Sequence, residues 1–173
     1  MDNSHPAALL KAQRRKDALI AALIDTRDKI IAVTAAFSPP ELDEVFLGVW
    51  SVMDILAHLI GWLVANRAAI LAIRAGQLPD FYADKDRGWQ TYNALLVSRY
   101  KRASLAEMTA ELRHSHGKLI DLVRSLPAEV LEADHGVHYR GYKVTIARLL
   151  QAELKDEKEH CQQMEDFRDI MGK

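Results

Sequence analysis

Cysteine and net charge are both scarce in this chain, and each scarcity excludes a class of protein. The single cysteine, Cys161, has no partner for an internal disulfide and belongs to no cysteine cluster of the zinc-ribbon type. Lys and Arg together number 23 and Asp and Glu number 24, which leaves a formal charge of -1 at pH 7. From this balance we expect no nucleic-acid partner and no anionic membrane surface as a partner.

Long hydrophobic runs are also missing. The longest candidate, Val49 to Ile73, is broken by polar residues such as Asp54 and Arg67, so we expect no membrane span. The chain starts Met-Asp-Asn-Ser-His-Pro with no apolar segment after a basic start, and we predict no signal peptide. The 173 residues, 49% hydrophobic and 27% charged, predict one globular cytoplasmic domain over 1–173.

Glycine and proline are few and clustered, which leaves long uninterrupted segments between them. The eight glycines and five prolines break the chain near 39–40, 76–79, 127 and 136–141. Between these breaks, apolar residues recur three and four apart, which predicts long helices near 9–37, 51–76, 104–126 and 145–171. A shorter helix is expected over 86–100. The predicted fold is all-α, an antiparallel four-helix bundle with mostly short connections and a short extra helix before the third long helix.

Capping signals support two of these helix starts. Ser51 is followed three residues later by Asp54, and Ser104 in the same way by Glu107, as in a capping box.

In the first segment the charged residues Lys16 and Arg27 interrupt the apolar stripe. We expect the charged ends of both side chains to extend to solvent.

Polar residues lie on helix faces that should be buried. On the fourth helix, Glu153, Glu157 and His160 fall within roughly 40° of the direction of the apolar residues, and Asp156 lies at the edge. His116 lies near the centre of the third helix's apolar stripe, and His58 at the edge of the second's. Burying several ionisable groups costs several kcal/mol unless they pair, bind a metal or face water.

Three explanations are open for these residues. The first is a structural polar layer, in which His116 or His58 bonds to Glu153 or Glu157. The second is a divalent metal site of His58, Asp156 and His160, a ligand set that suits Zn, Ni, Mn or Fe. The third is a metal-free site in which Glu153 or Glu157 acts as a general base.

The sequence argues against a carboxylate-bridged di-iron site. Glu157-x-x-His160 has the required spacing, but a second copy of the motif is absent. The two longest connections, Gln77 to Lys85 and Pro127 to Val144, contain aromatic and histidine side chains of the kind that line pockets at the mouth of a bundle. These are Tyr82, His135, His138, Tyr139 and Tyr142.

Two motifs resemble those of a known family. The segment from Trp50 to Trp62, with its Ala57-His58-Leu59, resembles the second-helix signature of DinB-like (DinB/YfiT) four-helix bundles. Asp156 and His160, followed by Gln163, resemble the family's fourth-helix motif, His-x-x-x-His followed by Gln. The resemblance spans roughly residues 8 to 170. Within this family the chain is most similar to the ClbS/DfsB branch, on the evidence of Trp89, Asn93, Tyr100, Ser104-Leu105 and Ser115-His116.

The resemblance implies a site and a range of activities. His58 and His160 would be the first and last metal ligands, and Asp156 stands where the family pattern has a histidine. The ClbS-like branch implied by the resemblance works without a metal. Activities in the family include thiol-dependent transferases and isomerases, metal-dependent hydrolases, and self-resistance hydrolases that act on a reactive cyclopropane.

We therefore predict a small-molecule hydrolase or transferase with a polar pocket in the bundle. The acid–base candidates are Glu157, Glu153 and His116, and a divalent metal at His58, Asp156 and His160 is one of two options, the other being no cofactor. The alternative function is a non-catalytic protein that binds or sequesters a small molecule. A homodimer is compatible with either.

Overall fold

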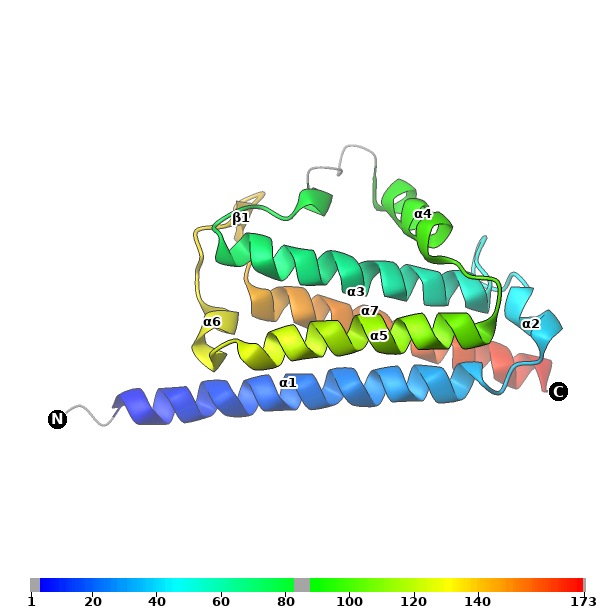
Figure 1. Ribbon diagram of the computed structural model, residues 1–173, viewed down its shortest axis with the longest axis horizontal. Helices are drawn as coiled ribbons and strands as arrows, with labels where there is room; N and C mark the ends of the chain where they lie inside the picture. The colour runs from blue at the N-terminus through cyan, green and yellow to red at the C-terminus, as the bar shows by residue number, and fades with distance from the viewer. Residues whose placement is uncertain (1–3, 83–87, 173) are drawn as a thin grey trace.

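The computed structural model describes residues 4–82 and 88–172, and most of them lie in helices (Figure 1). The four long helices are α1 (Ser4–Thr34), α3 (Val52–Arg74), α5 (Leu105–Ser125) and α7 (Ile146–Met171). The short elements are α2 (Pro39–Asp43), α4 (Gly88–Tyr100), α6 (Ala128–Glu132), β1 (His138–Tyr139) and β2 (Tyr142–Lys143). The predicted all-α bundle is confirmed, with α4 as the extra helix before the third long one. Part of the Gln77–Lys85 connection and the first three residues, used to predict the absence of a signal peptide, lie outside the described residues.

Two long helices run in each direction. α1 and α7 point one way and α3 and α5 the other, and α1 extends beyond the bundle at its N-terminal end (Figure 1). α3 packs against both α5 and α7, and α1 packs against α7 and α5. α5 starts at the same end of the bundle as α3, and residues 75–82 and 88–104 are the described parts of the connection between them. This connection carries α4, which packs on the outside of α3.

Side-chain caps fix the start of three long helices, as residue spacing predicts for two of them. Ser51 Oγ accepts a hydrogen bond of 3.3 Å from the Asp54 backbone N–H, and the Asp54 carboxylate accepts one of 2.9 Å from the Ser51 N–H. Ser104 and Glu107 form the same reciprocal pair. Thr145 Oγ1 accepts from the Arg148 N–H at 3.3 Å and starts α7. Each bond satisfies a backbone donor that the first turn of a helix leaves unpaired.

The core is continuous through the bundle, and α3 is its most deeply buried helix. Of the described helices, only α3 has the length and apolar composition that a membrane span requires. However, 61% of its most apolar 18-residue window is buried inside the bundle. Such burial is typical of the central helix of a helical domain.

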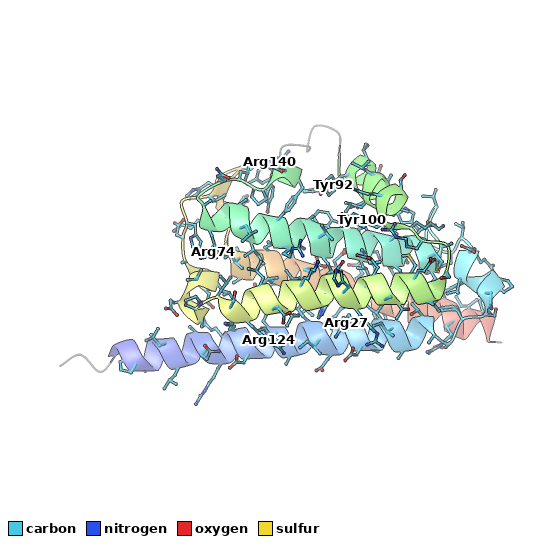
Figure 2. All side chains as sticks on the ribbon, in the orientation of Figure 1. Arg27, Arg74, Tyr92, Tyr100, Arg124 and Arg140 are labelled. Carbon is cyan, nitrogen blue, oxygen red and sulfur yellow. The ribbon has the colours of Figure 1, made fainter. Side chains whose placement is uncertain are left out.

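Lys16 and Arg27 do not extend to solvent, so that expectation is wrong. Lys16 is 6% exposed, and its Nζ donates to the carbonyl oxygens of Arg124, at 2.8 Å, and Leu126. These carbonyls lie at the C-terminal end of α5, where a positive charge is stabilising. Arg27 lies on α1 (Figure 2), and its Nη1 lies 2.9 Å from Nδ1 of His116 on α5. Both cations have hydrogen-bond acceptors inside the bundle. The spacing of apolar residues in the sequence carries no information about such acceptors.

Gly61 sets the distance between α3 and α4. A Cβ built on Gly61 would lie 2.7 Å from the Cβ of Leu96, closer than side chains approach one another. The absence of a side chain at 61 therefore lets α4 lie directly on α3. This position matters because α4 carries part of the wall of the cavity described next.

Candidate functional site

A cavity of about 660 Å³ opens between α3 and α7, under α4 and the β1–β2 hairpin. Residues four apart on α3 present one face to it, and residues of α7 form the opposite wall. Its aromatic walls are Trp62, Phe81, Tyr82, Trp89, Tyr139 and Tyr142. Its polar side chains are His58, Asn66, Asn93, Glu153 and Asp156, with Lys143 and Arg148 as its basic residues.

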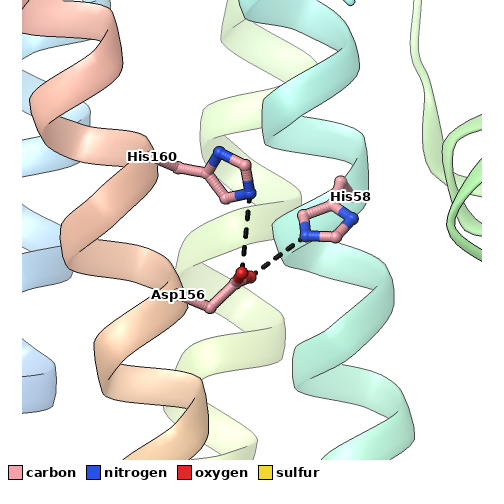
Figure 3. Close-up of side chains that lie close together, drawn as sticks. All are labelled: His58, Asp156 and His160. Carbon is pink, nitrogen blue, oxygen red and sulfur yellow. Dashed lines mark hydrogen bonds and ion pairs between the residues drawn. The ribbon is translucent and has the colours of Figure 1, made fainter. Parts of the chain in front are cut away.

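Three side chains converge beside this cavity, which His58 and Asp156 line and His160 does not. Asp156 and His160, one turn apart on α7, point toward His58 of α3 (Figure 3). His58 Nε2 lies 3.1 Å from Asp156 Oδ2, and His160 Nε2 lies 3.7 Å from Asp156 Oδ1. One ligand atom from each residue lies within 4.8 Å of the other two. The structure thus brings together the three residues for which the sequence suggests a metal site.

The ring of His160 is oriented by Gln163. His160 Nδ1 lies 2.7 Å from Gln163 Oε1, and a carbonyl oxygen only accepts, so Nδ1 carries the proton. The lone pair of the neutral ring is then on Nε2, the atom facing Asp156. Burial lowers the pKa of His160, with a further lowering by His58, against opposing effects of Asp156 and Gln163. Burial therefore favours the neutral form of His160, in which the lone pair on Nε2 is directed at the cluster.

Asp156 carries the charge of the cluster. Burial alone would raise its pKa, but the hydrogen bond to His58 and the charges of His160 and His58 outweigh that effect and lower it. Its side chain is 43% exposed, whereas that of His58 is 3% exposed. Asp156 is thus the member of the cluster that a ligand or ion can reach from solvent.

Trp50 packs against both histidines. Its ring centroid lies 4.9 Å from that of His58 and 6.2 Å from that of His160. Trp50 is held by a tight turn, in which its N–H donates to the Leu47 carbonyl at 2.9 Å. Gly48, inside this turn, has φ +63°, a value that favours glycine. The tryptophan before the capped helix therefore supports the rings of the cluster.

Glu153 lies at the cavity wall, one turn before Asp156. It is 4% exposed and accepts a hydrogen bond from the Asn66 amide on α3. Burial raises the pKa of Glu153 well above its usual value, and the charges of Glu157 and Asp156 raise it further. Both effects favour the protonated form of Glu153.

Glu157 and His116 lie behind the cavity, between α7, α5 and α1, and neither is among its lining residues. Arg27 Nη1 donates to His116 Nδ1 at 2.9 Å, and Arg27 also acts on the charge of Glu157. Burial raises the pKa of Glu157 to about 8, although Arg27 opposes the rise. Burial, and then Arg27, lower the pKa of His116 to about 4. Of the three acid–base candidates, only Glu153 can touch a ligand in the cavity.

Several lining residues were not identified from the sequence as site residues. Asn66 has a detectable signal, since it lies four residues after Trp62 and eight after His58 on the same face of α3. Of the connection residues considered, Tyr82, Tyr139 and Tyr142 line the cavity and His135 and His138 do not. Cys161 is 2% exposed with its pKa raised by burial, and it does not line the cavity.

Comparisons with known proteins place this geometry in a family. The sequence profile of the DinB superfamily matches residues 22–164. No curated protein sequence matches the chain. An uncharacterised protein from Escherichia coli UTI89 has a TM-score of 0.72 at 19% identity, covering 91% of this chain and 94% of that one. A protein from Streptococcus pneumoniae has a TM-score of 0.76 at 16% identity, covering 90% and 91%.

A third solved structure is the colibactin self-resistance protein ClbS in complex with a dsDNA. It has a TM-score of 0.69 at 17% identity, and the match covers 89% of this chain and 95% of ClbS. The exclusion of nucleic acid as a partner is therefore wrong, because a protein of this fold is crystallised with dsDNA. Net charge is a sum over the whole chain and carries no information about local clusters of Lys and Arg.

The match to ClbS is consistent with the resemblance to the ClbS/DfsB branch. The matched residues 22–164 run from the middle of α1 to near the end of α7 and include His58, Asp156 and His160. The chain belongs to the DinB superfamily.

Proposed function

We propose that this protein is a small-molecule hydrolase or transferase that uses a divalent metal held by His58, Asp156 and His160. The observation that carries the proposal is the convergence of two imidazoles and a carboxylate, of which His58 and Asp156 line a cavity of about 660 Å³. Such a cavity is large enough for a small organic substrate. Three protein ligands with further positions open are typical of catalytic metal sites.

The side chains present fit an ion of this kind. Ligand atoms about 2.1 Å from a tetrahedral ion lie about 3.4 Å from one another. The two distances to the Asp156 carboxylate, 3.1 Å from His58 and 3.7 Å from His160, bracket that value. Gln163 supplies the outer hydrogen bond that metal-binding histidines usually make. The buried Nδ1 of His58 has no hydrogen-bond partner among the described residues, so only one of the two rings has this support.

In the proposed reaction a bound ion would act as the Lewis acid, and Glu153 would act as the general acid. A divalent ion at the cluster supplies a Lewis acid and lowers the pKa of a bound water toward neutrality. Glu153 lies at the cavity wall, and its raised pKa favours the protonated form that could give a proton to a leaving group. The aromatic walls would hold the apolar part of the substrate.

Metal binding is the first test. Apo protein titrated with Zn²⁺, Ni²⁺ or Mn²⁺ in a calorimeter should bind one equivalent of at least one ion, and its Tm should rise. Asp156→Asn and His160→Gln should each weaken binding at least about tenfold. Glu129→Gln, an exposed residue on α6, serves as the control. Absence of binding by all three ions contradicts the proposal.

A second candidate is a non-catalytic small-molecule binder. The direct contact between His58 and Asp156 favours it, since the cluster partly satisfies itself without an ion. Mass spectrometry of retained ligands separates the candidates, because a binder returns its ligand unchanged and the metal-loaded enzyme returns product. The dsDNA complex of ClbS adds nucleic acid to the ligands that such a screen must include.

A further inference from the structure

The inner end of the cavity holds two hydrogen-bond acceptors that lack donors. Asn66 and Glu153 are 2% and 4% exposed, and the Asn66 amide N–H donates to Glu153 Oε2. Asn66 Oδ1 and Glu153 Oε1 then have no partner among the described residues. A buried polar group without a partner costs about 1–3 kcal/mol. Two such oxygens on neighbouring side chains are suited to a ligand that brings N–H donors.

The walls around these acceptors are aromatic faces. The rings of Trp62, Phe81 and Trp89 lie 5.2 to 6.2 Å from one another, centroid to centroid. The indole N–H of Trp62 already donates to Asn93 Oδ1 at 3.0 Å, so Trp62 offers a ligand its ring. Aromatic faces attract cations, most strongly where water is excluded.

The charges in the cavity favour a cation at its inner end. Glu153 is a buried carboxyl group there and Asp156 follows one turn later on α7, whereas the basic residues of the cavity are exposed and already engaged. Lys143 Nζ lies 2.7 Å from Asp134, and Arg148 donates to the Lys143 carbonyl at 2.9 Å. An exposed charge acts weakly through water, and a buried one acts strongly. A cation beside Glu153 also offsets the two causes, burial and neighbouring carboxylates, that raise its pKa.

We propose that the cavity binds a protonated primary amine with an apolar body. The ammonium group donates to Glu153 Oε1 and Asn66 Oδ1, and the body packs on Trp62, Phe81 and Trp89. This inference deepens the proposed function, since it names the substrate or ligand class of the same cavity. It does not require an ion at His58, Asp156 and His160.

The test compares four ligands of one shape on protein stripped of metal with EDTA. Binding of 3-phenylpropylamine, 3-phenylpropanol, 3-phenylpropanoate and 3-phenylpropyltrimethylammonium is followed by calorimetry and by quenching of tryptophan fluorescence. The amine should bind about tenfold or more tightly than the alcohol and the carboxylate. The quaternary ion, which has the charge but no N–H, should bind more weakly than the primary amine. Equal binding of amine and alcohol, tighter binding of the carboxylate, or equal binding of the two cations overturns the inference.

A variant pair locates the ammonium group. Glu153→Gln keeps an acceptor for Asn66 but cannot take the negative charge that a bound ammonium group stabilises, so it should lose about tenfold in amine affinity with alcohol affinity unchanged. Glu129→Gln should change neither. An unchanged amine affinity in Glu153→Gln overturns the placement of the ammonium group at Glu153. If this variant fails to fold, the comparison of the four ligands on the wild-type protein still tests the inference. Zn²⁺ binding without amine preference overturns this inference alone, and amine preference without metal binding overturns only the metal-dependent function.

Discussion

Arg27 and His116, on different helices, form a hydrogen bond that determines which nitrogen of a buried histidine carries the proton. The guanidinium Nη1 lies 2.9 Å from Nδ1 of His116. Because a guanidinium only donates, Nδ1 accepts and the proton of the neutral ring lies on Nε2. The bundle therefore contains a neutral histidine beside a permanent cation, and this arrangement depends on pH.

His116 should destabilise the protein in acid. Its pKa is lowered to about 4 in the folded state, against about 6.5 in an unfolded chain. The stability that this group contributes is present above pH 6.5 and is lost as the pH falls toward 4, on the order of 2 kcal/mol between pH 7 and 5. His116→Gln, which can still accept from Arg27, should show that much less change in urea unfolding between these pH values. His114→Gln, exposed on the same helix, is the control, and equal pH dependence in His116→Gln and wild type would contradict the prediction.

Glu157 should destabilise the folded protein as the pH rises, the opposite of the effect of His116. Burial raises its pKa to about 8, whereas an unfolded chain releases this proton near pH 4.5. The stability from Glu157 is full below pH 4.5 and is lost as the pH rises toward 8, on the order of 2 kcal/mol between pH 5 and 7. Glu157→Gln should therefore raise the free energy of unfolding at pH 8 and have little effect at pH 4.5, with Glu159→Gln as an exposed control. A Glu157→Gln protein that is less stable than wild type at pH 8 would refute this account.

Gln163 should control metal affinity through His160. Gln163→Leu removes the acceptor of the Nδ1–H and leaves the ring free to present the wrong nitrogen. Loss of such an outer partner typically costs about 10–100-fold in metal affinity. Calorimetric titration with Zn²⁺ measures the change, and Gln163→Glu, which retains an acceptor, should recover most of it. Gln162→Leu, whose wild-type side chain bonds exposed Asp166, should bind Zn²⁺ as wild type does. Wild-type affinity in Gln163→Leu would mean that Gln163 does not position His160.

Two glycines in helices should respond oppositely to alanine. Gly61→Ala places a Cβ 2.7 Å from that of Leu96 and should cost about 1–3 kcal/mol through displacement of α4. At Gly117 of α5 an added Cβ meets nothing within 4 Å, so Gly117→Ala should stabilise by up to about 1 kcal/mol. Thermal unfolding of both variants distinguishes a packing effect from a backbone effect. A Gly61→Ala protein as stable as Gly117→Ala would show that α4 is free to move outward.

The helices follow from local sequence signals, but the path of one connection does not. Ser51 with Asp54 and Ser104 with Glu107 are signals that act within one turn, and the structure confirms both starts. The apolar spacing gives each helix its buried face in the same local way. The common direction of α3 and α5 depends on how residues 75–104 cross the bundle, and no local pattern specifies that path.

The site was only partly predictable for a related reason. Helical spacing places both Glu153 and Glu157 on the inward face of α7, and both are buried. It does not say that Glu153 meets an open cavity and Glu157 meets the environment of Arg27, since those surroundings come from other helices. For Lys16 and Arg27 as well, the partners that keep them inside are more than 80 residues away in sequence.

Tyr82 and Tyr139 pack with ring centroids 4.5 Å apart and so join two segments of the cavity wall that lie outside the four-helix core. The β1–β2 hairpin that carries Tyr139 has only two-residue strands, so its backbone amides are protected by few hydrogen bonds. Segments of this kind open locally at a small fraction of the global unfolding free energy. Hydrogen exchange should therefore be fast at 138–143 and slow in α3, and a bound ligand should slow the hairpin first. The hairpin side of the cavity wall should thus open locally while the bundle stays folded.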